Sequence, residues 1–216
     1  MNATEWSSVV LMNRAETLLM NNPGRAWLQR SYEVPLLQRL GARLAGADVV
    51  EIGCGRGVVT ELLLERFGVA RVTALDLDPA MVARAQRRLA RYGARVDVRT
   101  GDASDLPFAP ASTDAVVDFG VIHHVPAWRD AVAEAARVIR PGGQFVFEEV
   151  TRHALQRWSY RTFLEHPEQD RFSAQEFVAE VERHGFVLPE PAVTRFFGDF
   201  VIGVAVKPAT TVGGPL

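Results

Sequence analysis

The sequence predicts an α/β protein with a doubly wound, mostly parallel sheet that carries helices on both faces. Between about residues 48 and 150, short runs of β-branched and apolar residues alternate with helical stretches. These stretches are long enough to connect parallel strands by right-handed crossovers. A glycine-rich turn follows the first run, which is typical of a backbone that approaches a ligand closely.

Length and composition fit one soluble globular domain. The chain has 216 residues, of which 48% are hydrophobic and 23% charged. Its formal net charge of −2 leaves no broad basic field to hold a polyanion, so nucleic acid is disfavoured as a partner. The one cysteine, Cys54, excludes an internal disulfide framework and a cysteine-cluster metal site.

The N-terminal segment MNATEWSSVVLMNRAETLLM lacks the basic start, apolar centre and cleavage site of a signal peptide. No run approaches the roughly 18 consecutive apolar residues of a membrane-spanning helix. We therefore expect a cytoplasmic protein without a membrane span. The sequence carries no feature that sets its oligomeric state.

The first half of the alternating region has clear boundaries. Asp78 and Pro79 stand where an N-cap and a first helical residue belong, and Gly93 ends the helix that they open. The region predicts strands at 48–53 and 71–77 and helices at 57–68 and 80–93. Late in the second helix, Arg84, Arg87, Arg88 and Arg91 are expected to form a solvated face rather than a phosphate site.

The second half continues the alternation. It predicts strands at 95–102, 113–122 and 142–150, and a helix at 127–140. Further on, Ser173 and Glu176 form a capping-box pattern at the start of a helix over 173–185. Two runs at 186–197 and 199–208 read as an antiparallel strand pair.

We expect a single domain over residues 1–216 with four parts. Residues 1–47 form an N-terminal helical cap, and residues 48–150 form the core that binds a cofactor. Residues 151–184 form a helical insertion that serves as a lid over a second ligand, and residues 185–208 form the terminal strand pair.

The turn in VVEIGCGRGVVT, residues 49–60, separates two classes of cofactor. A dinucleotide turn has the spacing G-x-G-x-x-G/A, which Gly53 and Gly55 match. The third position is Val58, and a glycine comes one residue early at Gly57. Glu51 would repel a pyrophosphate, but it suits the cationic amino group of S-adenosylmethionine, which has no phosphate.

Two more acids follow at the ends of the next strands. Asp76 comes 21 residues after Gly55, where a carboxylate can accept from both ribose hydroxyls. Asp102 follows the third strand, where it can accept from the adenine amino group, and the Ala103 N–H can meet a ring nitrogen. Asp76 alone does not distinguish the two cofactors.

At these residues the chain resembles the class I S-adenosylmethionine-dependent methyltransferases. The likeness rests on VVEIGCGRG, ALDLDPAM, GDASDLPF, DAVVDFGVIHHV and ARVIRPGG, which stand in the family's order over roughly residues 45–150. It is nearest to the small-molecule branch that includes ubiquinone and menaquinone biosynthesis enzymes. The resemblance implies a Rossmann-like, seven-stranded sheet in the order 3214576, with the last strand antiparallel.

The resemblance also assigns roles to residues. It places Glu51, Gly53 and Gly55 at the methionine portion of the cofactor, Asp76 at the ribose and Asp102 at the adenine, with Phe119 near the reactive methyl. The full set of predicted cofactor contacts is Glu51, Gly53, Cys54, Gly55, Asp76, Leu77, Asp102, Ala103 and Phe119. Cys54 is expected to be a small buried residue of the turn rather than a catalytic thiol.

The candidates for a catalytic base are less specific. They are His123, His124, Glu148, Glu149 and Tyr160. On an extended segment the two histidines would point opposite ways, and no cysteine or acidic cluster completes a metal site, so we expect no metal. Each candidate also has an ordinary alternative: the histidines as packed residues at the strand mouth, the two glutamates as solvent-facing or helix-capping acids, and Tyr160 as a core residue.

The sequence therefore predicts methyl transfer from S-adenosylmethionine, with S-adenosylhomocysteine as product, to a small, apolar or aromatic metabolite. Two alternatives stay open. One is a methyltransferase-like domain that binds the cofactor but transfers no methyl group, and the other is an NAD-dependent oxidoreductase.

Overall fold

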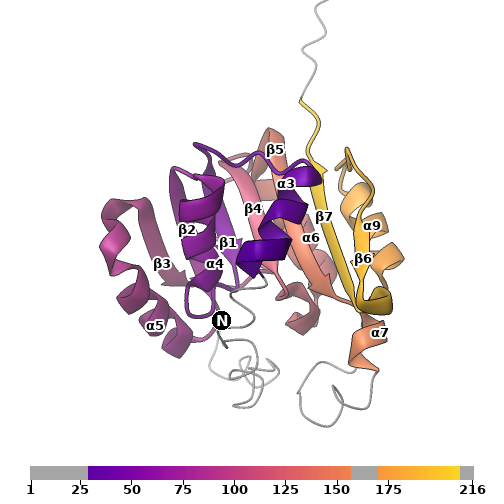
Figure 1. Ribbon diagram of the computed structural model, residues 1–216, viewed down its shortest axis with the longest axis horizontal. Coiled ribbons are helices and arrows are strands. Elements are labelled where there is room, and N and C mark those ends of the chain that lie inside the picture. Colours follow the sequence, from indigo (N-terminus) through magenta and orange to yellow (C-terminus); the bar gives the residue numbers. More distant parts are fainter. Residues whose placement is uncertain (1–28, 157–169, 210–216) are drawn as a thin grey trace, which may run out of the picture.

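The computed structural model describes residues 29–156 and 170–209 and contains one sheet in the order β3-β2-β1-β4-β5-β7-β6 (Figure 1). The pairs β1–β2, β1–β4, β2–β3 and β4–β5 are parallel, and β7 is antiparallel to both β5 and β6. This order confirms the predicted one. The strands are β1 (Asp48–Ile52), β2 (Arg71–Asp76), β3 (Val96–Thr100), β4 (Thr113–Phe119), β5 (Ile139–Val150), β6 (Val193–Arg195) and β7 (Phe200–Val206).

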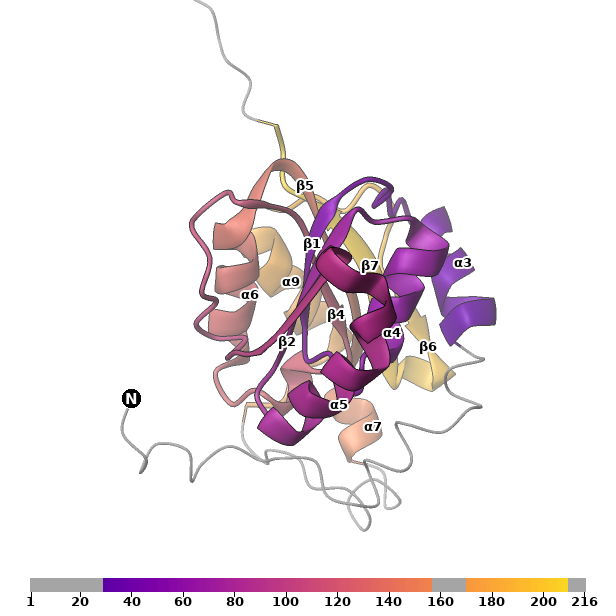
Figure 2. The same cartoon turned by 90° about the vertical axis from the view of Figure 1, so that its left-hand side faces the viewer.

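Helices cover both faces of the sheet, as Figure 2 shows. On one face lie α3 (Val34–Arg39), α4 (Val58–Leu62) and α5 (Pro79–Leu89), and on the other lie α6 (Trp128–Val138) and α9 (Ala174–Arg183). The short helix α7 (Arg152–Leu155) follows β5. Shorter helical turns are η2 (Gln29–Glu33), η3 (Leu63–Phe67), η4 (Ala90–Arg95), η5 (Ile122–His124) and η6 (Phe196–Gly198).

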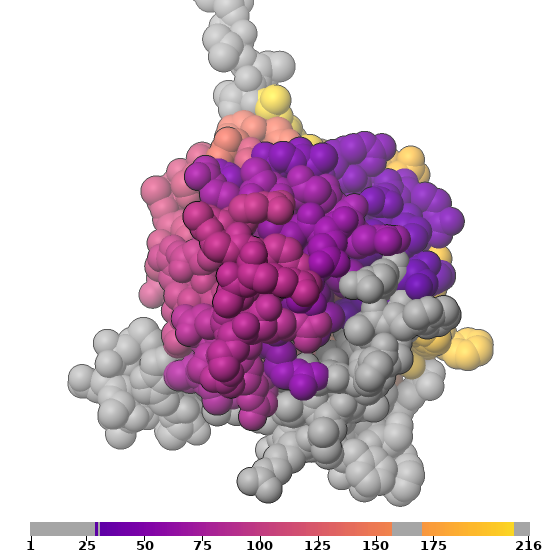
Figure 3. All heavy atoms as spheres, turned by 60° about the vertical axis from the view of Figure 1, so that its left-hand side comes forward, coloured from indigo at the N-terminus to yellow at the C-terminus, as the bar shows by residue number. Residues whose placement is uncertain are grey.

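Alternate strand residues supply two separate cores, because successive side chains of a strand point to opposite faces. Val49 packs with the residues of α3, α4 and α5, whereas Val50 packs with the large aromatic side chains of α6 and α9. Among those aromatics, Trp128 and Phe177 are almost fully buried, with ring centroids 5.9 Å apart. Figure 3 shows the first face closed over by the violet and magenta residues of the first half of the chain.

The predicted helix starts are confirmed. The Asp78 carboxylate accepts from Ala80 N at 2.7 Å, and Pro79 is the first residue of α5. At α9, the Ser173 hydroxyl accepts from Glu176 N at 3.2 Å while the Glu176 carboxylate accepts from Ser173 N at 2.7 Å. These caps fix where each helix begins, and in α5 the cap follows directly on the end of β2.

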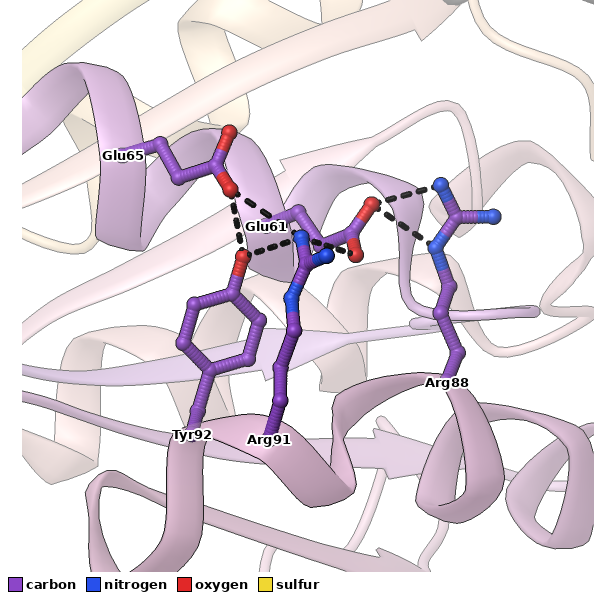
Figure 4. A network of polar contacts seen from close by, with 5 residues as sticks. All are labelled: Glu61, Glu65, Arg88, Arg91 and Tyr92. Atoms are coloured by element: carbon purple, nitrogen blue, oxygen red, sulfur yellow. Dashed lines mark hydrogen bonds and ion pairs between the residues drawn. The ribbon is translucent and has the colours of Figure 1, made fainter.

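An ion-pair network joins the two helices that follow β1 and β2 (Figure 4). The Glu61 carboxylate accepts from Arg88 Nε at 2.8 Å and from Arg91 Nη2 at 2.9 Å, and its side chain is only 9% exposed. Glu65 accepts from Arg91 and from the Tyr92 hydroxyl. The predicted solvated basic face is confirmed, since all four arginines are exposed, and two of them, Arg88 and Arg91, also bind this nearly buried carboxylate.

Three other expectations need correction or lie outside the described residues. The strand predicted over 186–197 contracts to β6 and one bridge between Val187 and Val206, because Pro189 and Pro191 donate no backbone hydrogen bond. The strand predicted over 113–122 ends at Phe119, and η5 follows. Of the predicted cap and insertion, residues 1–28 and 157–169 lie outside the described residues, and the four-part division stays a prediction.

No helix within residues 29–156 and 170–209 is long and apolar enough to cross a membrane.

Candidate functional site

The glycine turn after β1 uses its three glycines for different purposes. Gly53, Gly55 and Gly57 all have positive φ, at 65°, 53° and 79°. A Cβ on Gly53 would lie 2.1 Å from Val121 Cγ2, and one on Gly57 would lie 2.7 Å from Leu89 Cδ1. Within residues 29–156 and 170–209, no atom lies within 4 Å of a Cβ built on Gly55. Gly53 and Gly57 therefore permit close packing, whereas Gly55 faces open space that a ligand can enter.

Glu51 lies one residue before the end of β1 and is 2% exposed. Its Oε2 accepts from the Thr60 hydroxyl at 2.5 Å. Burial raises the pKa of Glu51 to about 7, and the charge of Asp76 adds to this rise while the Thr60 hydrogen bond opposes it. A buried acid of this kind stabilises a cation placed beside it.

Asp76 ends β2 and uses both carboxylate oxygens. Gly55 N donates to Oδ2 at 2.7 Å, and Asp78 N donates to Oδ1 at 2.9 Å. Cys54 N also donates to Leu75 O at 2.8 Å, so the glycine turn is attached to the end of β2 at two points. The carboxylate thus connects the two segments that were predicted to hold the cofactor.

The turn after β3 joins the same edge. Gly101 N donates to Asp76 O at 3.1 Å, and Asp102 Oδ1 accepts from Ser104 N at 2.8 Å and from Ser104 Oγ at 2.7 Å. The structure therefore brings Glu51, Asp76 and Asp102 to the carboxyl ends of three adjacent strands. Leu77 and Ala103 are half-buried beside these acids, and Phe119 is the buried last residue of β4.

Cys54 is buried within the turn. Burial, with the charges of Glu51 and Asp76, raises the pKa of the Cys54 thiol far above its ordinary value. The thiol therefore stays protonated, which agrees with the expected role as a small packed residue.

Glu149, a predicted catalytic candidate, is fully buried and holds the loop after β4. Its Oε1 accepts from Val121 N at 2.8 Å and Ile122 N at 2.6 Å. Its Oε2 accepts from Val150 N at 3.0 Å and lies 2.7 Å from His123 Nδ1. Since Val121 packs against Gly53, the Glu149 carboxylate also supports the glycine turn indirectly.

Asp118 is a second buried acid of this network, and sequence reasoning missed it. It is 0% exposed, and its Oδ1 accepts from Val121 N at 3.2 Å. Burial and the neighbouring charge of Glu149 raise the pKa of Asp118 well above its ordinary value, whereas His123, against the effect of burial, lowers the pKa of Glu149. The acidic residue in the otherwise apolar run AVVDFG, residues 115–120, was the signal that could have identified it.

The remaining catalytic candidates take different positions. The rings of His123 and His124 lie with centroids 4.1 Å apart in the η5 turn, so the prediction that they point opposite ways is wrong. A single helical turn, rather than extended backbone, places them together. Glu148 is 2% exposed on β5, opposite Phe119 of β4, and Tyr160 lies outside the described residues. Within the described ranges no group of three His, Cys, Asp or Glu could hold a metal.

The chemistry of this edge fits S-adenosylmethionine. Glu51 offers a buried acid for the amino group, Asp76 offers a carboxylate for a diol, and the space over Gly55 admits a ligand. A dinucleotide would place its pyrophosphate near Glu51, and the like charges would repel.

Comparison with known proteins agrees with this assignment. Residues 50–147 match the family model described as a methyltransferase domain. A probable S-adenosylmethionine-dependent methyltransferase of Mycolicibacterium smegmatis is 44% identical over 126 residues, which are 58% of this chain and 46% of that protein. A fatty-acid O-methyltransferase of the same species is 33% identical over 130 residues, which are 59% of this chain and 47% of that protein. The chain thus spans about half the length of these relatives.

Among solved structures, an S-adenosylmethionine-dependent methyltransferase of Aquifex aeolicus has the same fold, with a TM-score of 0.68 and 18% identity over 90% of this chain and 99% of that one. The NAD-dependent alternative is set aside by the family match. The nearer likeness to the ubiquinone and menaquinone branch stays a prediction. The motifs, the strand order and the family model agree that residues 50–147 form a methyltransferase domain of the S-adenosylmethionine-dependent kind.

Proposed function

We propose that the chain transfers a methyl group from S-adenosylmethionine to a small, apolar or aromatic metabolite. The observation that carries the proposal is the set of acids at adjacent strand ends, with Glu51 buried and Asp76 bonded to the glycine turn. In this proposal Glu51 pairs with the amino group, Asp76 accepts from the ribose hydroxyls and Asp102 accepts from the adenine amine. The Ala103 N–H and the side chain of Leu77 complete the adenosine contacts.

The cofactor, when bound, supplies an electrophilic methyl group on a sulfonium. The work of the chain is then to hold the acceptor atom in line with that methyl and to exclude water. Phe119 ends β4, and Val121 lies in the loop that follows it, where it packs against Gly53 of the glycine turn; both side chains are apolar. Apolar walls suit this task, since no charge needs to be stabilised on the departing sulfur.

A hydroxyl or carbon acceptor must also lose a proton, and His123 is the proposed base among the candidates. Its Nδ1 lies 2.7 Å from Glu149 Oε2, which fixes the orientation of the ring. Glu149, whose oxygens receive backbone donors, is proposed as the residue that positions His123. His124, Glu148 and Tyr160 stay predictions as groups that contact the acceptor.

The acceptor class draws support from a relative. The fatty-acid O-methyltransferase of Mycolicibacterium smegmatis is 33% identical, and its name specifies an apolar acceptor with an oxygen nucleophile. We therefore favour an acceptor with a long apolar part. The experiment that follows also identifies the atom that accepts the methyl group.

The test is mass spectrometry of a cell extract, lipids included, incubated with the purified chain and methyl-labelled S-adenosylmethionine. We expect a labelled lipid-soluble product that is absent when the Asp76→Ala variant replaces the wild type. Cofactor binding without a labelled product in any fraction would contradict the proposal and support the alternative of a domain that binds the cofactor but transfers no methyl group.

Cofactor affinity is expected to depend on pH through Glu51. Its pKa is about 7 in the free protein, and a bound ammonium group favours the ionised form and lowers that pKa. Above pH 7 Glu51 is already ionised and affinity is at its plateau, whereas at lower pH binding must first release a proton. Affinity should therefore fall by up to about tenfold per pH unit below pH 7.

Calorimetric titration between about pH 5.5 and pH 7.5 checks this, since the amino group of the ligand stays mostly protonated there. Glu51→Gln should lower the plateau affinity and remove the pH dependence. Thr60→Val removes the hydroxyl that stabilises the carboxylate, so the midpoint should move to higher pH. An affinity that is independent of pH in the wild type would refute the role of Glu51.

A further inference from the structure

The turn between β6 and β7 displays two aromatic side chains to solvent. Phe196 and Phe197 are 58% and 93% exposed, and Val187, at 56%, is the other large exposed hydrophobic residue within the described ranges. Single exposed apolar residues are ordinary on protein surfaces. These two differ because both stand on left-handed backbone, with φ of 51° and 60°, which bulky residues rarely adopt.

Hydrogen bonds hold this turn rigidly against the end of β5. The Thr151 hydroxyl donates to Gly198 O at 2.6 Å, and Thr151 N donates to Asp199 O at 2.8 Å. Beneath the turn, the buried Asp199 carboxylate lies 2.8 Å from His153 Nδ1. These contacts therefore hold the turn in place, with both rings pointing outward.

A polar groove runs beside the exposed rings, and Phe197 forms part of its wall. Arg152 and His153 line it with side chains that are 44% and 55% exposed. Gln156, Ser173 and Gln175 line it as well. The acids that face these two side chains are Glu176, which pairs with Arg152, and Asp199, which is covered by His153. Hydrogen-bond donors and an aromatic wedge thus lie side by side, as in proteins that bind the surface of a bilayer.

The turn lies on the side of the sheet where the parallel strands end, which is also the side of the candidate active site. Because β7 is antiparallel, its first residue, Phe200, pairs with Val150 at the end of β5. Figure 1 shows the turn next to α7, which follows β5 directly. The aromatic side chains therefore flank the carboxyl ends of the parallel strands, where Glu51 and Asp76 also lie.

The exposed surface is too small for a stable protein partner. Two aromatic side chains bury roughly 150–250 Å² each, whereas a stable interface needs about 800 Å² on each partner. Most residues that line the groove next to them have polar side chains, so the groove does not extend the aromatic patch. A lipid surface requires no shape complementarity, since its chains close around an inserted ring.

We propose that Phe196 and Phe197 insert into an anionic lipid surface while Arg152 and His153 contact its phosphate groups. The membrane would then deliver the apolar acceptor directly to the carboxyl edge. That last step rests on the proposed function, but lipid binding itself does not.

The test is cosedimentation of the full chain with vesicles of phosphatidylcholine alone or mixed with phosphatidylglycerol. The wild type should bind the mixed vesicles, and the double variant Phe196→Asn with Phe197→Asn should bind at least about tenfold more weakly. Asparagine tolerates positive φ, so the turn is retained, and thermal unfolding by circular dichroism verifies the fold. Arg152→Gln should weaken binding to the mixed vesicles only.

Val187→Asn is the control, because Val187 is about as exposed as Phe196 but pairs with Val206 at the far end of β7. It should bind as the wild type does. Failure of the wild type to bind either vesicle, or full binding by the double variant, would overturn the proposal. A concentration-dependent dimer that the double variant loses would also overturn it and assign the rings to self-association.

Calorimetry with S-adenosylmethionine separates this proposal from the proposed function. The double variant should keep the wild-type affinity for the cofactor. Vesicle binding without a methylated product would support the proposed insertion into lipid and refute methyl transfer. A methylated product without vesicle binding would refute the insertion alone.

Discussion

Replacing Asp76 with alanine is expected to weaken S-adenosylmethionine binding by about a hundredfold or more. The Asp76 carboxylate accepts from Gly55 N at 2.7 Å and from Asp78 N at 2.9 Å, and it is the proposed ligand of the ribose hydroxyls. Hydrogen bonds to charged groups contribute about 1.5–3 kcal/mol each, and about 1.4 kcal/mol corresponds to a factor of ten in affinity. The variant loses the ligand contact and the connection to the glycine turn together.

Isothermal titration calorimetry measures the effect, and Asp97→Ala serves as the control because Asp97 is an exposed acid of the adjacent strand β3. The control should bind the cofactor as the wild type does. Asp76→Asn should fall between the two, since one amide oxygen remains to accept from one of the two backbone donors. Equal affinity in all three variants would refute the assignment of Asp76.

Replacing Glu149 with alanine is expected to lower the free energy of unfolding by about 3–5 kcal/mol. The carboxylate is fully buried, and it accepts from Val121 N, Ile122 N and Val150 N as well as facing His123 Nδ1. Its removal leaves these donors unsatisfied away from water, and it leaves a cavity in place of the side chain. Urea denaturation followed by circular dichroism gives the change.

Glu149→Gln keeps the volume and one acceptor oxygen, so it should cost less than the alanine variant. The matched surface control is Glu182→Ala, an exposed position on α9 where we expect a change within about 0.5 kcal/mol. A loss in Glu149→Ala no larger than in this control would show that Glu149 does not hold the loop after β4.

Much of the cofactor edge could be predicted because it depends on local sequence. Strand ends, glycine positions and helix caps are set within a few residues, so Glu51, Asp76 and Asp78 were identified correctly as the acids at the ends of β1 and β2. The 21 residues from Gly55 to Asp76 span the helical segment of α4 and η3 and then β2, and a hydrogen bond from Gly55 N to the Asp76 carboxylate joins the two ends. The alternation of strands and helices in the sequence therefore predicted which residues lie at this edge of the sheet.

The loop after β4 could not be predicted in this way. Glu149 binds backbone groups 26 to 28 residues earlier in the chain, so its environment exists only after β4 and β5 pair. The same holds for Asp118, whose buried position depends on that pairing. The η5 turn that brings His123 and His124 together has no sequence signature comparable to the caps of α5 and α9.

The segment between α9 and β7 shows a second limit of prediction from the sequence. The run at 186–197 has the apolar composition of a strand, yet Pro189 and Pro191 restrict the paired part to β6. Past that strand, Phe196 and Phe197 look like core residues in the sequence and stand in solvent instead. Their hydrophobic character suggests burial, but they stand in a turn with left-handed backbone, which places both rings in solvent.

The most direct test of the central claim, that the acids at the ends of β1, β2 and β3 bind S-adenosylmethionine, is a calorimetric titration of the wild-type chain with S-adenosylhomocysteine. This product keeps the amino group, the ribose diol and the adenine. We predict saturable binding at one site per chain, with no binding of NAD under the same conditions. Folded protein that binds no S-adenosylhomocysteine, or that binds NAD in its place, would contradict the assignment.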